Sequence, residues 1–149
     1  MHENLDKIKS LESHPRIIKK IFNSNEIEKF IKLYLELPVT VNNLKQKVVK
    51  KRWTSGFGQE LEHILRDRIR SQIGDFVMDN INEDDGTECL GLFQESFNPI
   101  GLHVDGGFNL KDIIYKQTLL PLSDQGETII FKNRYYGPST MFINNEAGL

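Results

Sequence analysis

The spacing of the apolar residues changes about half-way along this chain, and that change limits the folds open to it. Up to about residue 82 the apolar residues recur at helical spacing. From Thr87 onward they form short runs rich in β-branched and aromatic residues, separated by Gly, Pro, Asn and Asp. The acidic stretch Glu83-Asp84-Asp85-Gly86 separates the two patterns. Helices followed by strands predict an α+β fold, with the helices packed on one outer side of a sheet.

Two helices are predicted in the first half. Asn23 and Glu26 have the spacing of a capping box, and Pro38 ends the stripe that follows. The apolar side chains of that stripe recur three and four residues apart: Ile27, Phe30, Ile31, Tyr34 and Leu35. A second helix is predicted from Gly58 to Met78, with Gly74 as a weak point that costs about 1 kcal/mol relative to Ala. The segment from Leu5 to Leu11 could form a shorter one.

Length and composition predict one domain, residues 1–149, with a mainly helical part at 1–82 and strands at 87–149. A net charge of −2 gives no footprint for nucleic acid or an anionic membrane, and no apolar run is long enough to span a bilayer. The N-terminus lacks the layout of a secretory signal, so we expect a cytoplasmic protein. The single cysteine, Cys89, excludes an internal disulfide and is expected to be a partly buried strand residue.

His103 and Asp105 are the candidate functional residues. Side chains two apart on a strand point to the same side, so an imidazole and a carboxylate would converge there. They would supply two of the three protein ligands of a 2-His-1-carboxylate Fe(II) site. The third ligand should be a second His further along, but no His follows Asp105 as far as Leu149. A hydrogen-bonded His–Asp pair near a strand end, with no metal, is the structural alternative.

The sequence after the pair has a recognisable order. Gly106-Gly107-Phe108 leads to a run from Ile113 to Leu122, and Ser123-Asp124-Gln125 then leads to the strand-like Gly126-Glu127-Thr128-Ile129-Ile130-Phe131. The stretch from Leu90 to Phe131, about a third of the chain, resembles the Fe(II)- and 2-oxoglutarate-dependent oxygenases of the prolyl 4-hydroxylase-like branch. The resemblance implies a double-stranded β-helix, also called a jelly roll, in which His103 and Asp105 bind the metal. It also implies 2-oxoglutarate as co-substrate and hydroxylation of a C–H bond in a small-molecule or peptidyl substrate.

The chain departs from that family at several positions. The family's distal His, and the Arg or Lys that pairs with 2-oxoglutarate, would fall beyond Leu149; Lys132 and Arg134 come too early to match. Phe93 and Phe97 lie where the family often has a Tyr, and neither carries a hydroxyl.

The number of predicted strands also indicates that part of the family's fold is absent from this sequence. The segment after Thr87 has room for about five or six strands, whereas a jelly roll has about eight. We therefore expect the chain to end before its domain does, leaving an incomplete jelly roll. An unpaired sheet edge of that kind would favour a homo-oligomer, and 2-oxoglutarate turnover would be negligible.

Other interpretations stay open. The chain could be a non-catalytic jelly-roll binding module with a structural His–Asp pair, or a cupin-type metalloenzyme, which would need more His. The basic run from Lys45 to Arg52, beside Trp53, could contact a nucleic-acid backbone, but we expect a solvated loop or helix face. His2, His14 and His63 are expected to be bystanders.

Overall fold

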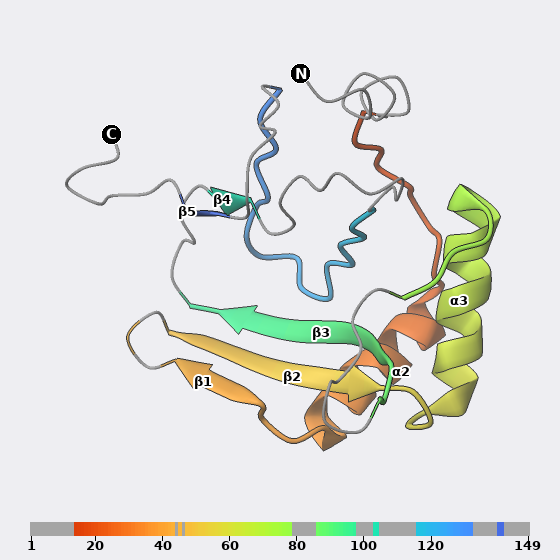
Figure 1. Cartoon of the computed structure of the whole chain (residues 1–149), viewed down its shortest axis with the longest axis horizontal. Coiled ribbons are helices and arrows are strands. Elements are labelled where there is room, and N and C mark those ends of the chain that lie inside the picture. The colour runs from red at the N-terminus through yellow and green to blue at the C-terminus, as the bar shows by residue number, and fades with distance from the viewer. Residues whose placement is uncertain are drawn as a thin grey trace. The chain divides into compact units, whose positions relative to one another are not determined.

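The computed structural model divides the chain into two compact units, one formed by Ile18–Pro99 and the other by Met1–Ile17 together with Ile100–Leu149 (Figure 1). The first unit holds two helices and a three-stranded antiparallel sheet, so the α+β prediction is confirmed at that level. That residues 1–149 form a single domain stays a prediction. The structure describes residues 14–43, 45, 47–78, 86–97, 103–104, 116–132 and 140–141.

Helix α2 (Ser24–Glu36) begins with the predicted capping box. The Glu26 amide donates to Asn23 Oδ1 at 2.9 Å, and the Asn23 amide donates to Glu26 Oε2 at 3.0 Å. Two otherwise unpaired amides of the first turn are thereby satisfied. The helix ends before Pro38, as predicted.

The buried face of α2 is turned relative to the predicted stripe. Phe30 and Leu33 are buried, whereas Ile31 and Leu35 are 37% and 69% exposed. Spacing alone could not distinguish these faces, because apolar residues lie on both. The sheet decides between them by covering the face that carries Leu33, a residue the predicted stripe left out.

The sheet has the order β1–β2–β3, with β1 at Val41–Asn43, β2 at Val48–Thr54 and β3 at Cys89–Ser96. Both pairings are antiparallel. Residues 41–43 and 48–54 are therefore strands, and the prediction of a solvated loop or helix face for the basic run is wrong at 48–52. The three consecutive cations from Lys50 to Arg52 obscure the apolar–polar alternation that would predict β2. Such residues can lie on either face of a sheet, because their long side chains cover apolar surface while the charged ends reach water. Cys89 begins β3 and is buried, as expected of it.

Helix α3 spans Gln59–Ile73, and the prediction that it continues to Met78 is wrong. Gly74 has φ of +80°, a conformation that L side chains rarely adopt, and its amide donates to the Arg70 carbonyl at 2.9 Å. The glycine thus ends the helix. Val77 lies beyond this stop and is 89% exposed.

An aromatic cluster forms the centre of the first unit. The Phe30 ring lies 5.1 Å from Phe22 and 6.0 Å from Trp53, both in edge-to-face geometry. Trp53 also contacts Phe93 of β3, with ring centroids 6.3 Å apart. One indole therefore joins α2 to the two longest strands of the sheet.

Arg68 links the two helices. Its Nη2 donates to Glu26 Oε1 at 2.8 Å, and its Nε donates to the Ile21 carbonyl at 2.9 Å. Glu26, buried at 8% exposure, thus serves both the cap of α2 and the contact with α3. A buried carboxylate needs partners of this kind to offset its lost hydration.

In the second unit, β4 (His103–Val104) pairs with β5 (Thr140–Met141) in antiparallel register. Residues 116–132 contain no helix and no strand, so the strands predicted at Thr118–Leu122 and Thr128–Phe131 are not formed. Ile129, Ile130 and Phe131 are between 59% and 71% exposed. β-rich composition becomes a strand only when a neighbouring segment supplies a ladder and a packed face. The short helix predicted near Leu5–Leu11 lies outside the described residues.

No helix in the part of the chain that the structure describes is both long and apolar enough to cross a membrane.

Candidate functional site

His103 lies on a strand, as the sequence predicted. Strand β4 lies beside β5 (Figure 1), and His103, the first residue of β4, pairs with Met141 and is half-buried. Extended backbone at this position is what a His-x-Asp pair needs if both side chains are to point one way. Asp105, the other predicted ligand, lies outside the described residues.

Among the residues described, no group of three or more His, Cys, Asp or Glu side chains could hold a metal ion. His14 and His63 are exposed, and His63 projects from α3. The surface position expected for His63 is confirmed, and the bystander role of both histidines stays a prediction. His2 lies outside the described ranges, so its predicted role stays a prediction.

The phenylalanines near the family's tyrosine position are placed differently from each other. Phe93 is half-buried; it faces α2 and contacts Tyr34 and Trp53. Phe97 follows the end of β3 and is 60% exposed. Lys132 is exposed, as a solvated charge should be, and Arg134 lies outside the described residues.

Trp53 cannot stack on a nucleic-acid base in this fold. It is 2% exposed, and its indole Nε1 donates to the Phe57 carbonyl at 2.6 Å. Base stacking on single strands requires an exposed aromatic face. Trp53 therefore cannot supply the stacking aromatic that the nucleic-acid interpretation of the basic run requires.

The end of α2 carries a polar cluster that the sequence did not reveal. Tyr34 donates its hydroxyl to Glu95 Oε2 at 2.6 Å, and Lys51 Nζ donates to the Tyr34 carbonyl at 2.7 Å. The ammonium also lies 4.2 Å from the centre of the Tyr34 ring. The hydrogen bond to Glu95, with burial and the carboxylate's charge, raises the pKa of Tyr34. This cluster fastens α2 to β2 and β3.

A second cluster holds the turn between β2 and α3. Glu62 accepts hydrogen bonds from the Ser55 hydroxyl at 2.9 Å and the Gly56 amide at 3.1 Å, and it pairs with Arg66 at 3.2 Å. Arg66 continues to Glu88 at 3.0 Å. Burial alone would raise the pKa of Glu62, but the hydrogen bonds from Gly56, Ser55 and Arg66 outweigh it and lower that pKa.

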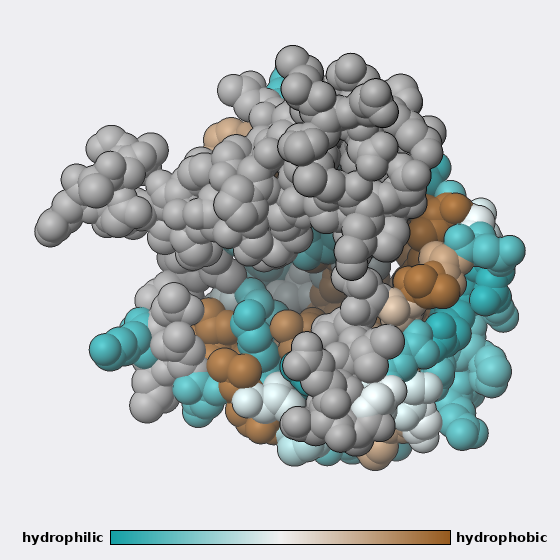
Figure 2. All heavy atoms as spheres, in the orientation of Figure 1, coloured by the Kyte–Doolittle hydropathy of each residue, from teal (hydrophilic) through white to brown (hydrophobic). Residues whose placement is uncertain are grey.

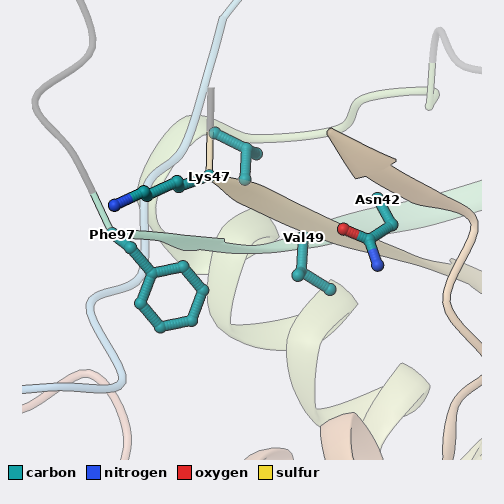
Figure 3. Close-up of a pocket in the computed structure, with 5 residues that line it drawn as sticks. Asn42, Lys47, Val49 and Phe97 are labelled. Atoms are coloured by element: carbon teal, nitrogen blue, oxygen red, sulfur yellow. The ribbon is translucent and has the colours of Figure 1, made fainter. Parts of the chain in front are cut away.

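A small hollow of about 220 Å³ lies near the turn end of the β1–β2 hairpin (Figure 3). Asn42 and Val49 face it from paired positions on neighbouring strands, and the Phe97 ring borders it beyond the end of β3. Of the described residues that line it, Lys47 alone is charged, so these residues include no group of titratable side chains suited to catalysis.

A larger hollow, of about 690 Å³, lies beside the sheet in the first unit. Its charged lining residues are Lys50 and Arg52, two positions apart on β2. The other described residues that line it are apolar or small and polar: Leu37, Pro38, Thr40, Val41, Thr54, Phe57 and Leu92. Figure 2 shows hydrophobic and hydrophilic side chains interspersed over the sheet. The alternation of Lys50 and Arg52 was the available sequence signal for this face, and the helix-or-loop interpretation of the basic run concealed it.

No protein-family profile, curated protein or solved structure matches this chain. The function must therefore be argued from the residues and their geometry.

Proposed function

We propose that the chain is an Fe(II)- and 2-oxoglutarate-dependent dioxygenase domain of the prolyl 4-hydroxylase-like type, which hydroxylates a C–H bond of a small-molecule or peptidyl substrate. The observation that carries the proposal is the placement of His103 on an antiparallel strand, immediately before Val104 and Asp105. The motif order from Leu90 to Phe131 supplies the class.

The donor set fits Fe(II) only in part. An imidazole nitrogen and a carboxylate oxygen are suitable ligands for ferrous iron, but oxygenases of this type use three protein ligands. Among the described residues, which do not include Asp105, no three His, Cys, Asp or Glu side chains lie together as a metal site. His103 and Asp105 alone would leave the ion held mainly by water, so we expect weak metal binding.

The proposal is tested by metal titration. Mn(II), which can stand in for Fe(II), is added to the chain while its electron paramagnetic resonance signal is recorded. We expect weak binding that disappears in His103→Ala and in Asp105→Ala, because each substitution removes one of two ligands. His63→Ala is the matched control, since that imidazole is exposed on α3. Tight stoichiometric binding that survives His103→Ala would place the metal elsewhere and refute this site.

The same variants separate the oxygenase from its main alternative. A non-catalytic jelly-roll module with a structural His–Asp pair would show no saturable metal binding, and His103→Ala would lower its stability instead. Succinate formation from 2-oxoglutarate, measured with the unmodified chain and with His103→Ala, completes the comparison. Turnover that depends on His103 supports the oxygenase, whereas equal background in both proteins, with no metal binding, supports the module.

A further inference from the structure

The sheet of the first unit has two faces with different surroundings. Lys51, Trp53 and Phe93 belong to the face that contacts α2, as their contacts with that helix show. Because side chains alternate along a strand, Lys50 and Arg52 belong to the opposite face. The cross-strand partner of Arg52 on that face is Leu92, which is 46% exposed.

Arg52 has an unusual environment on this face. Its Nε–H is shielded from solvent and has no hydrogen-bond partner among the described groups. No Asp or Glu side chain in the described part of the chain lines the hollow. A buried donor of a charged group is nearly always paired, because leaving it unpaired is costly. Arg52 itself lines the hollow, so its guanidinium is a cation without a carboxylate partner among the described residues, and an anion bound in the hollow would neutralise it.

The rest of the hollow indicates what kind of anion would fit. Leu37, Val41, Phe57 and Leu92 supply apolar surface around the two cations. A volume of about 690 Å³ is within the range of small-molecule sites, which combine apolar walls with a few fixed polar groups. The planar guanidinium matches a carboxylate in shape, and Lys50 adds a second positive charge two residues away.

We infer that this hollow binds a small organic acid, whose carboxylate pairs with Arg52 and Lys50 and whose apolar body lies against Leu92 and Phe57. The described residues that line the hollow all belong to the first unit. It requires neither the metal pair nor any oxidation. The inference can therefore fail while the proposed oxygenase function stands, and the reverse also holds.

The test uses the full chain, labelled with ¹⁵N, and hexanoate as the probe. We expect saturable shifts of the backbone amide signals of Lys50, Arg52 and Leu92 in NMR spectra. Arg52→Gln should weaken hexanoate binding about tenfold or more, because a charge-assisted hydrogen bond is lost. Lys50→Gln should weaken it several-fold. Lys32→Gln, the same charge change on an exposed residue of α2, should leave binding unchanged.

Two further probes define the ligand class. 1-Hexanol has the same apolar body without the charge, and inorganic phosphate has a charge without the apolar body. Both should bind more weakly than hexanoate. Hexanol binding equal to hexanoate would overturn the anion site, and phosphate binding equal to hexanoate would overturn the organic-acid class. Absence of saturable hexanoate shifts, or the same affinity in Arg52→Gln, would overturn the inference as a whole.

Thermal unfolding separates a binding role for Arg52 from a structural one. Its Nε makes no hydrogen bond within the described part of the chain, so Arg52→Gln should keep or raise the melting temperature. A marked fall would mean that the side chain supports the fold. Lys50→Gln would then decide the question, and unchanged hexanoate affinity in that variant would overturn the inference.

Discussion

Glu62 shows how much of the first unit depends on single polar side chains. Its carboxylate joins the turn after β2 to α3, and through Arg66 it reaches Glu88 immediately before β3. The side chain is 14% exposed, so these bonds are only partly screened by water. The sequence around Ser55 does not predict this hydrogen-bond network, because Ser55, Glu62 and Glu88 come together only when β2, α3 and β3 are packed.

Glu62→Gln should lower the free energy of unfolding at pH 7 by about 1–3 kcal/mol, because hydrogen bonds to a charged carboxylate are lost while the donors stay in place. Urea denaturation measures this difference. Glu28→Gln, on an exposed position of α2, is the matched control and should change stability by less than about 0.5 kcal/mol.

The Glu62 effect should depend on pH. The folded protein holds the pKa of this carboxyl below its ordinary value of 4.5. The stabilisation is therefore fully present above pH 4.5 and is lost as the pH falls through the lower, folded-state pKa. Unfolding curves of the parent and the Gln variant should converge in this acidic range. A difference that stayed constant down to low pH would show that the carboxylate charge is not its source.

At the level of elements, the sequence predicts both ends of α2 but neither the end of α3 nor the strand β2. The capping box at Asn23 and the stop before Pro38 depend on neighbouring residues, and both were predicted. Strand β2 depends on its pairing with β1 and β3, so its basic residues alone predict a solvated segment. Of the proposed ligands His103 and Asp105, the strand position of His103 is confirmed.

The cap of α2 can be tested directly. Asn23→Ala removes the side-chain acceptor for the Glu26 amide and should cost about 1 kcal/mol of stability. Asn23→Ser keeps an oxygen acceptor and should recover most of that loss. Both values come from urea or thermal denaturation. Equal stability of the Ala and parent proteins would mean that Arg68 and Glu26 hold the helix start without the cap.

Across the whole molecule, regular structure concentrates around Trp53. The indole is buried between α2 and the sheet, and β2 is the strand that pairs on both sides. Trp53→Ala should therefore cost about 3–5 kcal/mol, the usual penalty for removing a large buried aromatic side chain. The change in unfolding free energy measures it. Phe97→Ala is the control, because that aromatic ring is 60% exposed.

Amide hydrogen exchange should distinguish the sheet around Trp53 from the segments that lie outside helices and strands. Backbone amides of β2 should exchange slowest, because opening them requires disrupting a two-sided ladder around a buried core. Amides at 118–122 and 128–131 should exchange fast, because those residues are in neither helix nor strand. Exchange measured by NMR on the intact chain tests both expectations. Strong protection at 118–122 and 128–131 would show that they pair as strands in solution, which would contradict the exchange prediction and strengthen the jelly-roll proposal.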